Sequence, residues 1–349
     1  MILYLYKLIE RLLCFDMKLD QKSQRIRNIM PKTLLKTFFY IASFWVFLST
    51  LMSLSSSFNW FFALFSHFHP QIFLASLILA VVYFIKGRTE LAGIFCVCAF
   101  IHGWILASSV ELKPWSSPYV QKKDTVPIRV LALNLHQDES TLRPTAKIIE
   151  EEKPTLILLT ELPKNHKTFL SSLKEAYPYV SAQAPVGPFD VFLLSRWPIK
   201  KSTVEHNSSF LPILKAEICT PEQPSRCFSL AGLHSPTPFF SGSTLQEHMF
   251  NRLAHVSQEH QHSPFIIMGD LNSTPWSPLF RSLLTRSEMH SSAVGRSWQT
   301  TWFSRNPLLG LHIDHILINK HVESRAWWVG PNVGSDHYPV LADLELRWP

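Results

Sequence analysis

The chain has 349 residues and a formal net charge of +7, which is long enough for one large hydrophobic core or for two domains. Residues 1–111 hold 10 Lys and Arg against 5 Asp and Glu, a net of +5, which leaves +2 for residues 112–349. The larger C-terminal part therefore has no charge excess of the kind that marks a broad nucleic-acid-binding surface, and it shows no dense stripe of Lys and Arg.

Three apolar stretches precede residue 111, at residues 37–54, 71–85 and 91–110. Each is close to the roughly 20 residues that cross a bilayer as a helix, and residues 65–70 extend the shorter second one. A buried helical hairpin of a soluble protein is the alternative, but three closely spaced runs favour a membrane. We expect residues 34–110 to form a membrane anchor of about three transmembrane helices.

Basic residues flank these stretches unevenly, which predicts their orientation. A cluster precedes the first stretch, two lie between the second and third, and the loop between the first two has none. Because Lys and Arg favour the cytoplasmic side, the N-terminus is expected inside. The basic residues are Lys18, Lys22, Arg25, Arg27, Lys32, Lys36, Lys86 and Arg88.

An odd number of spans then places the C-terminal part outside. The sequence therefore predicts a multi-pass protein of the inner or plasma membrane, with its C-terminal domain in the periplasm or the exterior. Residues 1–33 would be a basic cytoplasmic segment and residues 111–126 a linker with prolines and polar side chains. Residues 127–349 would form the globular domain.

Short β-rich runs alternate with helical patterns throughout residues 127–349. This mixture of βα units with hairpins predicts an α/β sandwich that contains mixed sheets. The expected strands are 129–133, 155–159, 191–194, 211–218, 227–233, 265–268, 315–318 and 340–346, and the expected helices are 141–152, 167–176 and 243–259.

Two of the five cysteines, Cys219 and Cys227, bracket a short segment between two expected strands. A hairpin there would bring them close enough for a disulfide, which requires an oxidising compartment. Two unrelated small core residues are the other interpretation. The sequence leaves both open.

Polar residues recur where the expected strands end. Asn134, Glu161, His234 and Asp270 each follow an apolar run, and Asn272 lies two residues beyond the last of these. A single residue of this kind is commonly a turn residue. Several in one domain, with compatible chemistry, predict a site built at one edge of a sheet.

Two chemical roles fit these side chains and others further along. A hard cation such as Mg²⁺ takes oxygen ligands, which Asn134, Glu161 and Asp336 can supply. A carboxylate, or a histidine supported by one, can orient and deprotonate a water. Asp314 is expected to hold the ring of His337 for this purpose.

Seven segments of the C-terminal part form a recognisable series: LALNLH (131–136), LLTEL (158–162), LLSRWPI (193–199), GLHSPTP (232–238), MGDLNSTP (268–275), HIDHILI (312–318) and GSDHYPVLADL (334–344). The most specific motifs among them are GDLN and SDHYPV. In this order, the segments resemble the endonuclease/exonuclease/phosphatase superfamily. The domain is similar to deoxyribonuclease, sphingomyelinase and apurinic endonuclease catalytic domains, and its arrangement after N-terminal spans resembles the membrane-attached bacterial branch.

The resemblance implies a four-layer sandwich of two mixed β-sheets flanked by helices, and a divalent-metal site. Asn134 and Glu161 would help to hold Mg²⁺ or Mn²⁺, and Asp336 would be a further ligand or belong to a second site. His234 matches the histidine that contacts the phosphate and can protonate the leaving group. Apurinic endonucleases have Tyr at this position, which argues against a strict repair enzyme.

The remaining catalytic positions also follow from the resemblance. Asp270 would orient or activate the attacking water, and Asn272 would stabilise the pentacovalent phosphorane. Asp314 would orient His337, which would serve as general base or as phosphate ligand. Other histidines, such as His312 and His315, lack zinc spacing and are interpreted as surface or core residues.

The sequence therefore predicts a membrane-anchored, divalent-metal-dependent phosphoester hydrolase at the outer face of a membrane. Its partners would be the lipid bilayer and a phosphoester substrate, which is either a lipid head group or nucleic acid. No obligatory protein partner is inferred. The alternative is a non-catalytic membrane scaffold or binding protein that retains the fold.

Overall fold

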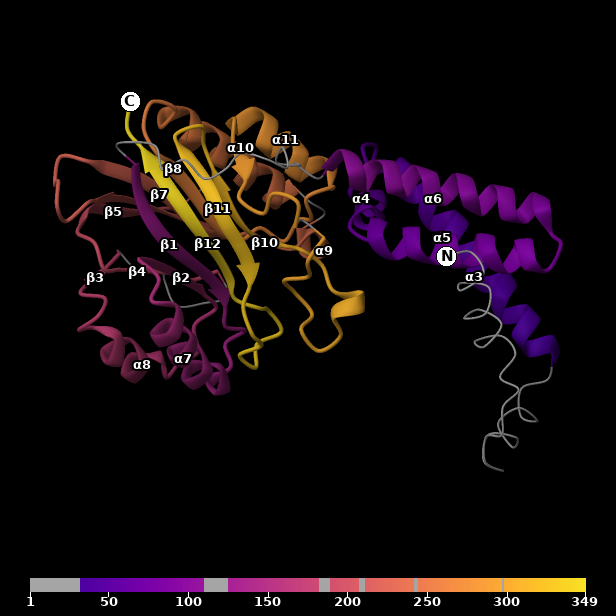
Figure 1. Ribbon diagram of the computed structural model, residues 1–349, viewed down its shortest axis with the longest axis horizontal. Helices are drawn as coiled ribbons and strands as arrows, with labels where there is room; N and C mark the ends of the chain where they lie inside the picture. The colour runs from indigo at the N-terminus through magenta and orange to yellow at the C-terminus, as the bar shows by residue number, and fades with distance from the viewer. Residues whose placement is uncertain (1–31, 110–124, 182–188, 207–210, 242–243, 297) are drawn as a thin grey trace. The chain divides into compact units, whose positions relative to one another are not determined.

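A computed structural model of the chain describes residues 32–109, 125–181, 189–206, 211–241, 244–296 and 298–349 (Figure 1). The expected cytoplasmic segment at residues 1–33 and the expected linker at residues 111–126 fall almost wholly outside these residues. The chain divides into two compact units between Leu48 and Ser49, so the first described helix begins in one unit and ends in the other.

Four helices occupy the expected membrane anchor: α3 (Lys32–Leu54), α4 (Trp60–Ser66), α5 (His69–Ile85) and α6 (Thr89–Ser109). Within the described residues, α3 and α6 are each long and apolar enough to cross a membrane. The second expected span is a broken pair, because α4 and α5 meet at a 64° bend. Asn59 caps the start of α4, and Pro70 lies in the first turn of α5, where a missing N–H is tolerated.

The domain that follows contains two six-stranded sheets. Sheet A has the order β11-β12-β1-β2-β4-β3, and sheet B has the order β5-β6-β7-β8-β10-β9. The strands of sheet A are β1 (Thr125–Asn134), β2 (Leu156–Thr160), β3 (Tyr179–Val180), β4 (Val191–Ser195), β11 (Val322–Val329) and β12 (Val340–Arg347). Those of sheet B are β5 (Ile199–His206), β6 (Pro212–Cys219), β7 (Cys227–His234), β8 (Phe265–Asp270), β9 (His290–Ser291) and β10 (Asp314–Ile318).

Both sheets are mixed, as expected. β1 pairs parallel with β2, and β7 pairs parallel with β8. The other strand pairs are antiparallel, among them β1 with β12 and β8 with β10. A strand that is antiparallel to its neighbour begins at the edge of the sheet where the neighbour ends. The starts of β10 and β12 therefore lie at the same edge as the ends of β8 and β1.

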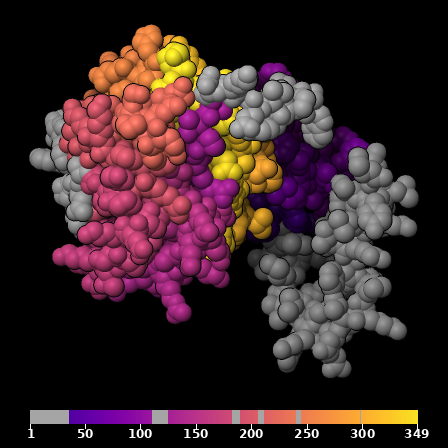
Figure 2. All heavy atoms as spheres, turned by 60° about the vertical axis from the view of Figure 1, so that its left-hand side comes forward, coloured from indigo at the N-terminus to yellow at the C-terminus, as the bar shows by residue number. Residues whose placement is uncertain are grey.

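Helices cover the outer face of each sheet. α7 (Leu142–Glu152) and α8 (His166–Leu173) pack on sheet A, while α10 (Thr244–Glu259) and α11 (Pro278–Ser287) pack on sheet B. Short helical turns are η1 (Glu139–Thr141), α9 (Pro238–Ser241) and η2 (Pro307–Leu309). The face that carries α7, α8 and the strands up to β6 is turned forward in Figure 2, coloured magenta to salmon.

Strand alternation explains the layers. On β1, Val130 and Ala132 face the core between the two sheets, whereas Leu131 and Leu133 face the core beneath α7 and α8. A strand that is buried on both faces reads as a continuous apolar run, which is what these segments show. The four-layer α/β sandwich expected from the sequence is confirmed.

Two glycines are required by close packing. A Cβ at Gly232 would lie 2.4 Å from Leu158 in the opposite sheet, which leaves no room for any larger side chain. Gly269 has φ +140°, and a Cβ there would lie 1.9 Å from the carbonyl oxygen of Leu233. Gly269 directly precedes Asp270, so this backbone conformation sets the position of that carboxylate.

Cys219 and Cys227 form a disulfide that joins the paired ends of β6 and β7. The sequence left open whether these cysteines form a disulfide or are unrelated core residues, and in the structure they form the disulfide. We expect the double variant Cys219→Ala/Cys227→Ala to lower the free energy of unfolding by about 2–3 kcal/mol, because the bridge closes a short loop in the unfolded chain. Thermal or denaturant unfolding of the two proteins measures this difference, and an unchanged midpoint would contradict it.

Candidate active site

The candidate residues converge because of strand direction. β1, β2, β7 and β8 all end at one edge of the two sheets, and they deliver Asn134, Glu161, His234 and Asp270 there. β10 runs antiparallel to β8 and begins at the same edge, where Asp314 lies opposite Asp270 in the register. The turn before β12 brings Asp336 and His337 to this edge, because β12 runs antiparallel to β1. Asn272 follows directly after β8.

Asp270 lies at the centre of this group and is only 2% exposed. Its Oδ1 accepts the backbone N–H of Asn272 at 2.9 Å, and its Oδ2 accepts from Asn134 Nδ2 at 3.2 Å. His234 Nε2 lies 3.4 Å from Oδ2, and His337 Nε2 lies 3.7 Å from it. Burial, with the Asp314 charge nearby, raises the pKa of Asp270 to about 6, although the two histidines oppose the shift.

Asp314 and His337 form a buried ion pair. His337 Nδ1 donates to both carboxylate oxygens, at 2.9 Å and 3.1 Å. Burial disfavours the charged ring, but Asp314, Asp270 and Asp336 outweigh that cost and raise the pKa of His337 to about 10. The ring is therefore a cation at neutral pH, and its Nε2 faces the group around Asp270.

Glu161 and Asn134 lie beside each other, with Asn134 Nδ2 donating to Glu161 Oε1 at 2.8 Å. Glu161 has φ +51°, a left-handed conformation that is uncommon for this residue type and marks a constrained turn. The next residue, Leu162, donates its backbone N–H to the buried carboxylate of Asp190 at 3.2 Å. Asp190 therefore holds the turn that carries Glu161.

The His234 and Asn272 side chains complete the same edge. Asn272 Nδ2 donates to the carbonyl oxygen of Ser235 at 2.7 Å and lies 3.4 Å from His234 Nε2. Phe189 packs against the His234 ring at a centroid distance of 5.2 Å. These contacts fix both side chains next to Asp270 and leave the His234 ring 3.7 Å from Glu161 Oε1.

Three further residues hold the turn of Asp336 and His337 in place: Trp302 and His136, which the sequence did not single out for the site, and Ser335, which it offered either as a hydrogen-bonding residue near the site or as a turn residue. Trp302 Nε1 donates to Asp336 Oδ2 at 3.0 Å, and His136 Nδ1 lies 3.3 Å from Asp336 Oδ1. Ser335 Oγ donates to the carbonyl oxygen of Asn134 at 2.7 Å and accepts the N–H of His337. The turn before β12 is thereby hydrogen-bonded to the end of β1.

The side chains present suit a hard divalent cation. The site gathers the carboxylates of Glu161, Asp270 and Asp336 with an amide side chain, and oxygen donors of this kind are what Mg²⁺ and Mn²⁺ prefer. Asp336 Oδ1 is buried and makes no hydrogen bond, although the ring nitrogens of His136 and His337 lie 3.3 Å and 4.0 Å away, so it keeps a lone pair for a cation or water.

By distance alone, the described residues also offer Asp270, Asp314 and His337, whose ligand atoms lie within 4.8 Å of one another. Asp314 and His337 already bind each other, so we regard Asp270 as the member of this trio that is available to a metal. Of the ligands predicted from the sequence, Asn134 and Glu161 contact each other beside Asp270, and Asp336 Oδ1 lies 4.0 Å from His337 Nε2.

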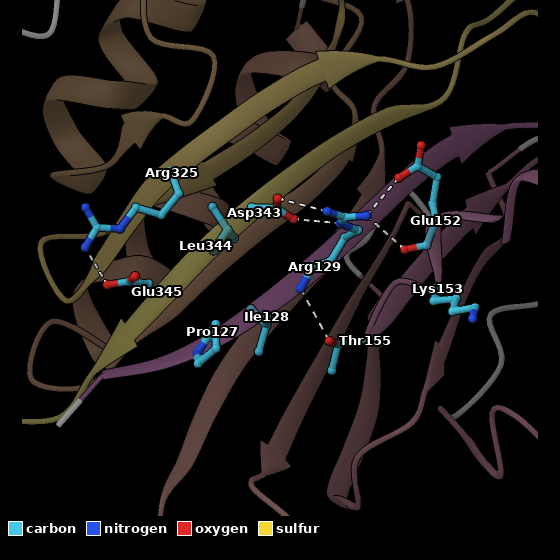
Figure 3. A pocket seen from close by; sticks show the side chains of 10 residues that line it. All are labelled: Pro127, Ile128, Arg129, Glu152, Lys153, Thr155, Arg325, Asp343, Leu344 and Glu345. Carbon is cyan, nitrogen blue, oxygen red and sulfur yellow. Dashed lines mark hydrogen bonds and ion pairs between the residues drawn. The ribbon is translucent and has the colours of Figure 1, made fainter. Parts of the chain in front are cut away.

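A surface hollow of about 490 Å³ lies beside the N-terminal half of β1, where Arg129 is the central side chain (Figure 3). Arg129 donates a bidentate pair to Asp343 at 2.7 Å and 3.0 Å and binds Glu152 at 2.9 Å. The positive charge of Arg129 is therefore neutralised by two carboxylates of the protein itself. We assign this hollow to the packing of α7 against sheet A rather than to the candidate site.

The sequence interpreted His312 and His315, which flank Asp314 in the chain, as surface or core residues, and both are buried. Each is about 1% exposed, and the two rings pack against each other at a centroid distance of 4.8 Å. His312 also stacks on Trp327, and the His315 ring lies tilted against Phe280 at 4.3 Å.

A model of the endonuclease/exonuclease/phosphatase family matches residues 131–337. The match spans more than half of the chain, from the end of β1 to His337, and the chain belongs to this family. Members of the family generally hydrolyse phosphoester bonds. A comparison with curated proteins gave no match.

Solved structures share the fold at low sequence identity. A family protein from Bacteroides vulgatus is 16% identical with a TM-score of 0.53, and the alignment covers 64% of this chain and 100% of that chain. A family protein from Beutenbergia cavernae DSM 12333 is 17% identical with a TM-score of 0.52, covering 63% and 72%. The human Nocturnin catalytic domain is 20% identical with a TM-score of 0.50, covering 64% and 96%.

Proposed function

We propose that this chain is a membrane-anchored, divalent-metal-dependent phosphoester hydrolase of the membrane-attached bacterial branch, acting at the outer face of the membrane. The observation that supports it best is the convergence on Asp270. Two histidines, an amide side chain and the turn of Asn272 all approach this one buried carboxylate. Buried carboxylates and histidines with strongly shifted pKa values are characteristic of active sites.

Asp270 and His337, the two site residues with strongly shifted pKa values, have different roles in the proposed reaction. The carboxylate of Asp270 is ionised at neutral pH because its pKa is about 6, so it can accept a proton from an attacking water. His337 is a cation at neutral pH because its pKa is about 10. A cation can bind the phosphate but has no free lone pair to accept a proton, so we assign His337 the role of phosphate ligand rather than general base. The sequence left both roles open for His337, and we favour the phosphate ligand.

The remaining side chains bind and orient the substrate. His234 and Asn272 lie side by side next to Asp270, where they can donate to phosphate oxygens and to the leaving-group oxygen. Asn134, Glu161 and Asp336 would hold Mg²⁺ or Mn²⁺. The ion, when bound, would supply neutralisation of the phosphate charge and stabilisation of the leaving oxygen.

Contacts with the helical region support action at the outer face. Residues 55–71 contain no Lys or Arg, which favours the outer side for this segment. His67 within it bonds through Nδ1 to Thr274 Oγ1 at 3.0 Å, and its carbonyl oxygen accepts from Trp276 Nε1 at 3.0 Å. The domain therefore contacts the segment that the charge distribution places outside, in agreement with an odd number of spans.

The test uses the full-length chain, purified and inserted into lipid nanodiscs. It is assayed on sphingomyelin, phospholipids, phosphoinositides, plasmid DNA and a water-soluble phosphate diester, before and after EDTA. We expect hydrolysis of at least one of these that EDTA abolishes. No metal-dependent hydrolysis of any of them would favour the alternative, a non-catalytic scaffold that retains the fold.

A further inference from the structure

The loop that connects β9 to β10 exposes large apolar side chains. Trp298, Leu308 and Leu309 are 67%, 84% and 55% exposed. We call these three residues the apolar prong. Trp298 and Leu308 line one hollow of about 440 Å³, so they lie near each other although ten residues separate them in the sequence. Clustered exposed apolar residues of this size commonly mark a contact with a protein or a membrane.

The loop that carries the apolar prong is bonded to the turn that carries Asp336 and His337. Trp302, from the same loop, bonds to Asp336 and forms an isolated bridge with His337. Ser304 N–H donates to the carbonyl oxygen of Asp336 at 2.9 Å, and Tyr338 N–H donates to that of Thr301 at 2.8 Å. These hydrogen bonds hold the loop against the turn that carries Asp336 and His337. They therefore fix the position of the prong relative to the candidate site.

The loop also contacts the start of a helix of the membrane anchor. Gln71, in the first turn of α5, donates through Nε2 to the carbonyl oxygen of Gly310 at 3.1 Å. Pro70 and Gln71 line the same hollow as Trp298 and Leu308. The prong therefore lies at the end of α5 that the charge pattern places at the outer surface, whereas Lys86 and Arg88 follow the other end.

We propose that Trp298, Leu308 and Leu309 insert into the outer leaflet, so that the site faces the lipid head groups and the substrate class is a phosphodiester lipid of the same membrane. Lipid is the expected partner of the apolar prong because the loop that carries it contacts the outer end of α5. An apolar surface at the outer end of a membrane helix lies at the depth of the lipid. Trp is also the residue type enriched at this depth. The substrate part of the proposal rests on the proposed function.

The insertion is tested without any activity measurement. In the full-length chain, Cys14, Cys96 and Cys98 are replaced by Ser, and a nitroxide label is attached at Leu308→Cys or, as control, at Val180→Cys. Val180 is 43% exposed on β3 at the edge of sheet A. The proteins are placed in vesicles of phosphatidylethanolamine and phosphatidylglycerol. We expect oxygen to relax the Leu308 label more strongly than a water-soluble nickel chelate does, and the reverse at Val180. Equal accessibility to the nickel chelate at both positions would overturn the insertion.

A second measurement tests the substrate class. Leu308→Glu/Leu309→Glu is expected to lower hydrolysis of lipid in the vesicle by at least ~10-fold, because charged side chains replace inserted apolar ones. Hydrolysis of a water-soluble phosphate diester should stay within about two-fold of wild type, since neither residue contacts the site. Unchanged lipid hydrolysis would contradict the proposal. If the wild-type chain hydrolyses neither substrate, the proposed function fails, and the label accessibility still decides the insertion.

Discussion

Replacing Asp270 by Asn is expected to lower phosphoester hydrolysis at least ~10³-fold, because the variant loses both the proton acceptor and a charge that faces the metal position. Asp270 accepts from Asn134 and from the backbone of Asn272, and it faces both histidines. An amide of the same shape keeps the volume but has no negative charge. The measurement is kcat/KM on whichever substrate the wild-type chain hydrolyses.

The matched control is Asp343→Asn. Asp343 is a carboxylate on β12 that pairs with Arg129, five residues before Asn134 on β1, and its side chain is 36% exposed. Ion pairs this exposed contribute little to stability, about 0–1 kcal/mol. We expect activity within about two-fold of wild type, because the residue is far from the reacting atoms. Comparable losses in both variants, or an active Asp270→Asn protein, would show that the carboxylate has no special role.

Replacing Asp314 by Asn is expected to lower kcat about 10²–10⁴-fold, since His337 then loses the partner that orients its ring and keeps it charged. Asp314 bonds to His337 Nδ1 through both oxygens. Without this charge, burial acts against the imidazolium and the pKa of His337 falls from about 10. The ring would then hold its proton less tightly and would bind phosphate more weakly.

The same pair makes a prediction for stability in the metal-free protein. The folded-state pKa of His337 is about 10, well above the ordinary histidine value of 6.5. Its protonation therefore stabilises the fold fully below pH 6.5, and this contribution is lost as pH rises through about 10. Asp314→Asn should cost roughly 3–5 kcal/mol at pH 7, as expected for a broken buried ion pair. The cost should be smaller at pH 10.5, and a pH-independent difference in unfolding free energy would contradict the assignment.

A double-variant cycle separates positioning from independent chemistry. If Asp314 acts through His337, then adding Asp314→Asn to His337→Gln should change kcat very little further. Full additivity of the two losses would mean that Asp314 has a role of its own, such as direct contact with a metal.

The fold was predictable where side-chain periodicity was strong. The last five residues of β1, β2, β7 and β8 are all buried, so each strand ends as a short apolar run next to a polar residue. The sequence did not reveal β5 or β11, because Ile199–His206 and Val322–Val329 carry charged residues along their length. Each is a strand at the edge of its sheet, where pairing on one side and exposure on the other weaken the apolar pattern.

The candidate site was predictable at the strand ends and less so elsewhere. Asp314 and His337 were expected to pair, and in the structure they are bonded. The supports of the site were missed. Trp302 and His136 contact Asp336 from segments far away in sequence, and Asp190 holds the turn after Glu161 from the start of β4. A residue that acts through a long-range contact has no local pattern, so only the folded arrangement identifies it.

The most direct test of the central claim is hydrolysis by the full-length chain in nanodiscs when the metal is removed and restored. Wild-type protein and Asp270→Asn are assayed in parallel, first as purified, then after EDTA, and then after addition of Mg²⁺ or Mn²⁺. The account predicts that wild-type activity disappears with EDTA and returns with the metal, while Asp270→Asn stays at least ~10³-fold lower throughout. Activity that survives EDTA, or that is the same in both proteins, would contradict a metal-dependent site centred on Asp270.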